Sequence, residues 1–313
     1  MIDTILGGVG QGFLWAILAL GVYISYRLLD VADLSCEGTI TLGASLAAMF
    51  IWKGVNPFLA AVLAFAGGAL AGIITGVLHT KLKIPAILAG ILTMISCYSI
   101  NIHIMSLATG TEGTANLSLL NFRNETVFAK INALLGLGKI NSSIIFAVVV
   151  AAALIGLLYY FFGTEIGCAI RATGANANMC RAQGIDTDLT KIMGLALGNG
   201  LIALAGALLC QYQNYSDVNM GVGSIVIGLA SIIIGETLFM KAKNFAMKLS
   251  GIVVGSVIYR VVVSLVIYSG MPSTDLKLMT AVIVMVALSL PMIKTKFAAK
   301  KKKPVKKEVA DHV

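Results

Sequence analysis

Long apolar segments, separated by short polar connections, make up most of this chain. Nearly every segment is apolar around its whole circumference, which is typical of helices immersed in lipid rather than of helices with one core-facing stripe. A spanning helix needs about 20 largely apolar residues, and no segment alternates with the period of a membrane β-strand. The pattern predicts an all-α, polytopic membrane protein with about nine transmembrane helices. The predicted spans are residues 5–26, 36–52, 57–80, 84–107, 141–163, 191–212, 222–240, 249–270 and 277–293.

The connection formed by residues 108–140 is long enough to have structure of its own. Apolar residues recur in it at helical spacing, which predicts a short helix lying at the membrane surface. These residues are Val127, Ile131, Leu134 and Leu135.

The connection formed by residues 164–190 is polar and rich in Gly and Ala. Its centre predicts a short helix over residues 176–183, with Gly174 before it and Gly184 after it as a C-cap. Such a helix can dock into a groove on a soluble partner, and the alternative is a simple connecting loop. The apolar residues on its face are Met179 and Ala182.

The positive charges orient the spans by the positive-inside rule. With the C-terminus inside, the cytoplasmic connections carry nine Lys and Arg against five outside, and residues 294–313 add eight lysines. We therefore predict that the N-terminus lies outside and the C-terminus inside. The opening MIDTILGGVGQGF lacks the basic stretch of a secretory signal, so the first apolar segment is expected to be retained as a span. Residues 1–293 form the predicted transmembrane domain, and residues 294–313 a basic, disordered cytoplasmic tail near anionic lipid.

Composition excludes several classes of protein. The chain is 58% hydrophobic and 12% charged, whereas soluble domains average about 45–50% and about 25%. This excludes a soluble enzyme and a nucleic-acid binder, since six of the nine net positive charges lie in the tail. The five cysteines show no CxxC spacing and are interpreted as packing residues, and no metal site is predicted. No P-loop motif occurs and the three histidines lie far from other candidate ligands in the sequence, so we predict no enzymatic activity and no bound cofactor.

The connection 164–190 contains four short motifs in a fixed order: a threonine-x-x-glycine opening, an arginine–alanine pair, an asparagine and a glycine–isoleucine pair. The next span contains an alanine–glycine pair. These residues are Thr164, Gly167, Arg171, Ala172, Asn176, Gly184, Ile185, Ala205 and Gly206. Their order resembles that in the membrane subunits of ABC importers of the branched-chain amino acid and ribose permease family. Segments 33–44, 82–94 and 223–239 are similar to other parts of that family, so the likeness covers residues 5–293. The nearest subgroup is associated with aromatic amino acids such as tryptophan or tyrosine.

The resemblance implies an importer in the cell membrane of a prokaryote. Two copies of this subunit as a homodimer, or one copy with a close relative, would form the substrate path. Two cytoplasmic ATPase subunits would use ATP and grip the loop helices, and an extracytoplasmic binding protein would deliver the substrate. The residues carried over as the coupling region are Arg171, Ala172, Gly174, Asn176, Met179, Arg181 and Gly184.

Two ionisable residues inside the late spans are candidates for the translocation path, since burying a charge in lipid costs about 2.5 to 3.5 kcal/mol on insertion scales. Arg260 lies about eleven residues into its span, where its guanidinium could meet a substrate carboxylate. A pair with Glu236, or a water-filled crevice at the subunit junction, is the alternative. Glu236 lies about one turn from Lys241, so an ion pair or an extension to the membrane surface also explains it.

Polar residues at the start of the second span are further candidates. Asp33 or Ser35 can cap this helix, and Glu37 lies in its first turn, where it favours the helix dipole. Capping explains most of this cluster, and a gate lining is the alternative. Asn199 is a hypothesised lining residue of a later span.

Two other functions compete with the importer. A secondary transporter driven by protons or sodium normally has a carboxylate or a discontinuous helix near the bilayer midplane, and the sequence pattern predicts no carboxylate there. A non-transporting scaffold would use the basic tail to recruit partners.

Overall fold

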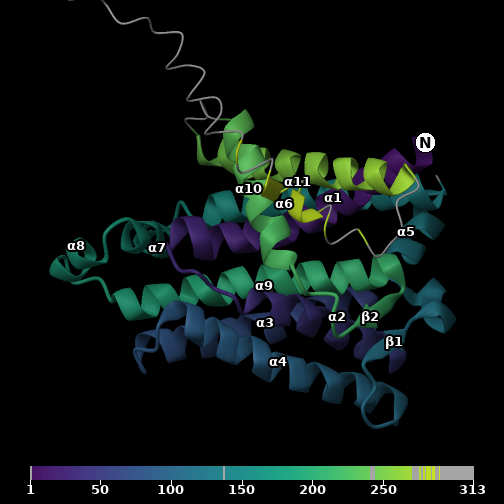
Figure 1. The fold of residues 1–313 in the computed structure, drawn as a ribbon, viewed down its shortest axis with the longest axis horizontal. Coiled ribbons are helices and arrows are strands. Elements are labelled where there is room, and N and C mark those ends of the chain that lie inside the picture. The colour runs from purple at the N-terminus through teal and green to yellow at the C-terminus, as the bar shows by residue number, and fades with distance from the viewer. Residues whose placement is uncertain are drawn as a thin grey trace, which may run out of the picture.

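The computed structural model describes residues 2–136, 138–239 and 244–269, together with isolated positions between 275 and 289. Its ribbon is an elongated bundle in which most helices run along the long axis (Figure 1). The helices are α1 (Ile2–Tyr23), continued by a π-helical turn η1 (Ile24–Leu28), α2 (Cys36–Trp52), α3 (Pro57–Thr80), α4 (Ala86–Thr109), a 3-10 turn η2 (Leu120–Glu125), α5 (Val127–Leu135), α6 (Lys139–Phe161), α7 (Glu165–Ala175), α8 (Ala177–Ala182), α9 (Thr187–Gln213), α10 (Ser224–Leu238) and α11 (Phe245–Tyr268). The strands are β1 (Asn116–Ser118) and β2 (Tyr215–Asp217), which pair antiparallel.

Helices occupy eight of the nine predicted spans. Among the described residues, six helices are long and apolar enough to cross a membrane, whereas α2 and α10 are shorter apolar helices. The ninth predicted span, residues 277–293, lies outside the described residues apart from isolated positions, and the tail 294–313 lies wholly outside them. The helical membrane class is confirmed for the described chain, and the count of nine stays a prediction.

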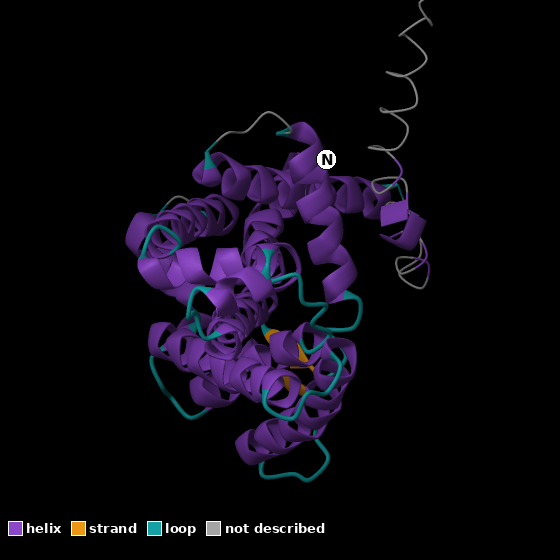
Figure 2. Cartoon of the chain, turned by 90° about the vertical axis from the view of Figure 1, so that its left-hand side faces the viewer, coloured by secondary structure: helices purple, strands orange, loops and turns teal. Residues whose placement is uncertain are grey.

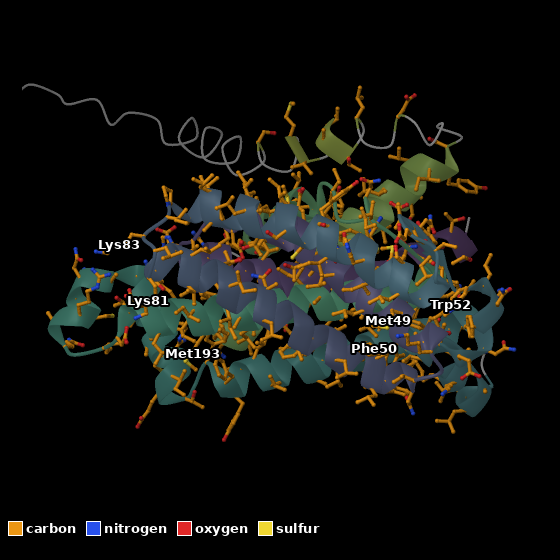
Figure 3. The ribbon with its side chains drawn as sticks, turned by 90° about the horizontal axis from the view of Figure 1, so that it is seen from below. Met49, Phe50, Trp52, Lys81, Lys83 and Met193 are labelled. Carbon is orange, nitrogen blue, oxygen red and sulfur yellow. The ribbon has the colours of Figure 1, made fainter. Side chains whose placement is uncertain are left out.

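The two ends of the bundle carry different segments. Helices α7 and α8 project at one end, and the N-terminus and α5 lie at the other (Figure 1). Lys81 and Lys83 lie at the α7–α8 end and Trp52 at the opposite end (Figure 3). This division agrees with the sides to which the charge pattern assigned these segments.

Helix α9 lies at the centre of the described fold, where it packs against α1, α2 and α3. Glycines allow this packing, because they let helix backbones approach closely in a membrane protein. A methyl group placed at Gly43 of α2 would overlap the carbonyl oxygen of Ala203, and one at Gly206 of α9 would overlap that of Ile40. The small residues therefore fix the distance between α2 and α9.

Helices α2 and α10 begin inside the bundle rather than at an end. After η1 the chain turns back inward, and Val31, Asp33 and Ser35 are buried. Ser35, the N-cap of α2, contacts Asn199, which is twelve residues after the start of α9. Helix α10 begins where Gly223 donates its backbone N–H to Glu37. From this meeting point α2 runs to the end that carries Trp52, and α10 runs towards Arg27.

The N-terminal end of the bundle contains α5 and the β1–β2 pair. Figure 2 shows these two short strands among elements that are otherwise helical. Helix α5 confirms the short helix predicted in residues 108–140. Thr126 caps it, and Gln211 of α9 accepts the backbone N–H of Val127. Val127 is buried and Leu134 is 83% exposed, so the predicted apolar stripe is only partly covered by this chain.

Candidate functional site

The connection 164–190 contains two short helices rather than one. The unpredicted helix is α7, which Thr164 caps by accepting the backbone N–H of Gly167. Thr164 followed by Glu165 is an N-terminal helix signal that could have found it. A methyl group at Gly174 would overlap the carbonyl oxygen of Leu28, so this glycine allows α7 to lie directly against η1.

Helix α8 confirms the predicted short helix in the second half of this connection. Asn176 caps it by accepting the backbone N–H of Met179 at 3.0 Å. Gly184, which follows it, has φ +81°, a value that favours glycine. Cys180 is fully buried, whereas Met179 is 48% exposed. One face of α8 thus packs against the rest of the chain through Cys180, while Met179 faces outward.

Two arginines tie this region to the rest of the chain. Arg181 donates through Nε to the hydroxyl of Thr187 at 2.8 Å, which joins α8 to the start of α9. The guanidinium of Arg171 lies 5.4 Å from the ring centroid of Phe245 in α11. Ala172, between them in the sequence, is half-buried. These contacts join α8 to α9 and α7 to α11.

A cleft of about 560 Å³ lies beside α8, between the connection that follows α3 and the start of α9. Its lining includes charges of both signs, among them Lys83, Lys191 and Asp188. Asp186, the N-cap of α9, also lines it, and the backbone N–H groups of Leu189 and Asp188 lower the pKa of its carboxyl. The cleft at this end of the molecule therefore presents charges of both signs.

Three of the predicted path residues form one buried polar group. Asp33 accepts the side-chain amide of Asn199 at 2.7 Å through Oδ2, and its Oδ1 accepts the backbone N–H of Ser35 at 2.8 Å. The hydroxyl of Ser35 lies 3.2 Å from Asn199 Oδ1. All three side chains are at most 3% exposed. This group joins the start of α2 to the middle of α9.

The capping predicted for the second span is partly wrong. Ser35 occupies the N-cap position, but its side chain makes no cap hydrogen bond because it bonds Asn199 instead. Asp33 supplies the acceptor at this helix start. Glu37 lies in the first turn as predicted, and its carboxylate accepts the N–H of Gly223 at 3.0 Å.

A cavity of about 320 Å³ opens beside Glu37, between α2, α4 and the segment that leads to α10. Polar groups lie among its apolar walls. The residues that line it are Glu37, Gly38, Thr41, Met94, Ile95, Tyr98, Asn101, Val218, Asn219 and Val222. Sequence reasoning missed Asn101, although an asparagine in the middle of an apolar span is itself a signal of a buried polar site.

Arg260 and Glu236 do not pair with each other. Glu236 forms an ion pair with Nε of Arg27 at 2.9 Å, and Lys241 lies outside the described residues. The guanidinium of Arg260 lies 4.3 Å from the ring centroid of Trp15 in α1, and its Nε has no hydrogen-bond partner in the part of the chain described. Arg260 is also absent from the lining of the cavity beside Glu37.

The fold is that of a multi-pass membrane protein. It has long apolar helices, two short helices that begin inside the bundle, and a helix pair that projects at one end. The chain belongs to the family described as branched-chain amino acid transport system permease components, whose profile matches residues 4–289. The family resemblance inferred from the loop and span motifs is thereby confirmed. The chain is a permease subunit of an ABC-type transport system, not an enzyme.

Individual relatives support the same conclusion. The chain is 41% identical over 279 residues to the tyrosine transport system permease protein of Clostridioides difficile (strain R20291), with 89% of this chain and 88% of that protein covered. It is 28% identical over 257 residues to the ribose import permease protein RbsC of Haemophilus influenzae, with 82% and 75% covered. It is 27% identical over 232 residues to the probable branched-chain amino acid transport permease protein LivH of Methanocaldococcus jannaschii, with 73% and 72% covered. No solved structure matches this chain.

Proposed function

We propose that this permease subunit belongs to an amino acid importer and couples to cytoplasmic ATPase subunits through α7 and α8. The proposal depends on one observation: α8 is fixed to the rest of the chain, yet its apolar face is exposed. Asn176, Cys180 and Arg181 anchor the helix, and Met179 stays exposed. A short, rigidly held helix with an outward apolar side chain suits a groove on a soluble partner. Its anchors to α9 would carry ATPase closure into the bundle.

The proposed orientation places the α7–α8 end in the cytoplasm and the N-terminus outside. Lysine and arginine gather at the α7–α8 end, where Lys81, Lys83 and Lys191 lie near Arg181. The positive-inside rule assigns such an end to the cytoplasm. A substrate-binding protein would then meet the end that carries α5 and the β1–β2 pair.

The proposed translocation path lies between two copies of this subunit, with ATP bound by the ATPase partners and no cofactor held by this chain. An amino acid is the proposed cargo, supported by the 41% identity to a permease of a tyrosine transport system. The buried group formed by Asp33, Ser35 and Asn199 would hold the interior start of α2 in place beside the path. Glu37 would face the path, and Arg260 would be a second polar group near it.

One observation favours the alternative of an ion-gradient-driven transporter. The sequence pattern predicts no carboxylate in the middle of the spans, and this prediction is wrong for the interior of the bundle. The chain turns inward after η1, so Asp33 and Glu37 lie inside the bundle. Secondary transporters use such carboxylates and discontinuous helices. Family membership favours the ATP-driven importer, and uptake that stops on ATP depletion but survives an ionophore would separate the two.

The test of the proposal is co-purification of an ABC ATPase subunit with this chain from its native membrane. Met179→Glu places a charge on the exposed face of α8, and we expect it to abolish ATPase co-purification from mild detergent while the permease stays folded. Leu134→Glu is the matched control, because it makes the same kind of change on a short helix at the opposite end. The proposal fails if no ATPase accompanies the wild-type chain, or if both variants retain it equally.

A further inference from the structure

The cavity beside Glu37 combines polar acceptors with an apolar wall. Its polar side includes the Glu37 carboxylate and the Asn101 side chain, and its apolar side includes Met94, Ile95 and Val222. A volume of about 320 Å³ falls within the range of about 300–1,000 Å³ that small-molecule sites occupy. The cavity is therefore large enough for a single small solute.

Asn101 leaves an unused acceptor at this cavity. The side chain is 1% exposed, and its Nδ2 donates to the carbonyl oxygen of Gly38 at 3.3 Å. This bond orients the amide, so Oδ1 is the free atom, and Oδ1 has no partner in the described chain. A buried acceptor without a donor costs about 1–3 kcal/mol. A ligand that brings an N–H or O–H donor would remove this cost.

Glu37 supplies a negative charge to the same cavity. Its Oε1 accepts the backbone N–H of Gly223, which fixes the carboxylate at the meeting point of α2 and α10. It forms no ion pair in the part of the chain that the structure describes. A carboxylate facing lipid is costly, so the cavity must open towards water or towards another subunit. The Glu37 carboxylate thus favours a cationic donor, and the Asn101 oxygen can accept from the same group.

The opposite wall of the cavity favours an apolar body. Ile95, Tyr98 and Val222 lie at its open side and are each at least half exposed. In a membrane permease, an exposed apolar wall next to a fixed carboxylate matches a molecule with a charged head and an apolar side chain. A sugar would leave the Glu37 charge without a counter-charge.

We propose that this cavity is a substrate subsite that holds the α-ammonium group of an apolar or aromatic amino acid between Glu37 and Asn101, with the side chain against Met94, Ile95, Tyr98 and Val222. The proposal rests on the importer function proposed above and specifies its substrate class. It also assigns a role to α2 and α10. Both helices begin inside the bundle, and this brings Glu37 close to the segment that contains Val222.

The test uses proteoliposomes that contain the permease, its co-purified ATPase and the binding protein encoded beside them. The probes are radiolabelled L-tyrosine, L-leucine and D-ribose. We expect ATP-dependent uptake of at least one of the two amino acids and none of ribose. We also expect 3-(4-hydroxyphenyl)propionate, which lacks the ammonium group of tyrosine, to compete poorly.

Two conservative variants then probe the subsite. Glu37→Gln keeps an oxygen for the Gly223 N–H and removes the charge, and Asn101→Leu keeps the volume and removes the acceptor. We expect each to lower the rate of uptake at limiting substrate by about 10- to 100-fold, the loss typical of a charged hydrogen bond. Gly156→Ala in α6, where nothing lies within 4 Å of the added methyl group, is the control and should leave uptake unchanged.

The outcomes separate this inference from the proposed function. Uptake of ribose alone, uptake of neither amino acid, or unchanged amino acid uptake in both Glu37→Gln and Asn101→Leu would overturn the subsite. Absence of a co-purifying ATPase would overturn the importer proposal instead. ATPase co-purification with both variants, measured in parallel, shows that lost uptake does not come from lost assembly.

Discussion

The centre of the bundle and its α7–α8 end are built in opposite ways. Around α9, glycines bring helix backbones into direct contact, and the buried polar group of Asp33, Ser35 and Asn199 is paired within the chain. At the α7–α8 end, Met179 and Ala182 are exposed, although their helix is firmly capped. The centre thus satisfies this polar group within one chain, and the exposed face of α8 agrees with the proposed docking of a partner at the α7–α8 end.

The largest expected effect comes from filling the close contact at the centre. Gly206→Leu would drive a side chain into the backbone of Ile40, and we expect a loss of more than about 3 kcal/mol, beyond the usual cost of overpacking. Gel filtration in detergent should show aggregation or loss of the folded peak. Gly156→Ala is the control, since nothing lies within 4 Å of the added methyl group. Equal behaviour of the two variants would disprove the close contact.

Cysteine reactivity should distinguish the two regions and also test the orientation. Cys168 of α7 is the exposed cysteine, while Cys36 and Cys210 are buried. We expect an impermeant maleimide to label Cys168 in inside-out vesicles but not in intact cells. In a Cys168→Ser background, Leu134→Cys should show the reverse pattern. Labelling of Cys168 in intact cells would mean that the proposed orientation is inverted.

The buried polar group should show a smaller but measurable effect. Asp33→Ala removes the acceptor of the Ser35 N–H and one of the two acceptors of the Asn199 amide, which keeps its bond to the Leu195 carbonyl oxygen. We expect a loss of about 1–3 kcal/mol in thermal unfolding in detergent. Combining Asp33→Asn with Asn199→Asp reverses the donor and acceptor and should recover part of the loss. A double variant no more stable than Asp33→Asn alone would argue against the pairing.

The smallest effect is expected at the start of α9. Asp186 is exposed and caps this helix, so Asp186→Ala should lower the unfolding temperature slightly and Asp186→Asn less, because Asn retains a cap acceptor. The backbone N–H groups lower the pKa of Asp186, so its stabilising effect is present above its ordinary pKa and is lost as pH falls through the lowered value. A difference between wild type and Asp186→Ala that grows on acidification would contradict this sign.

Sequence reasoning succeeded where one segment carries the whole signal. The apolar lengths located eight described helices, six of them long enough to span a membrane. The spacing of Val127 and Ile131 located α5, and Asn176 with Gly184 located α8. The family followed from short motifs in fixed order. The sequence analysis does not predict α7, because the polar composition of the connection favours a loop. Thr164 followed by Glu165 is nevertheless an N-terminal helix signal.

The partners of the buried polar residues could not be predicted in the same way. Asn199 meets Asp33 from 166 residues away, Glu236 meets Arg27 from 209 residues away, and the chain pattern gives no distance between them. The sequence leaves three positions open for Arg260: facing the path, paired with Glu236, or in a crevice at the subunit junction. The structure excludes the pair with Glu236 and places the guanidinium over Trp15, and a position beside the path stays a prediction. Such pairings depend on which helix faces meet, and a helix that is apolar all round does not reveal its orientation.

The sequence by itself determined the helical membrane class, the places of the spans, the charge asymmetry between the two sides and the permease family, since each depends on hydropathy, charge or motif order along the chain. Only the tertiary structure decided that α2 and α10 begin inside the bundle and that Glu37, Asn101 and Val222 line one cavity. The physical reason is that backbone contacts at glycines set how helices approach and turn, and those contacts join residues far apart in the sequence.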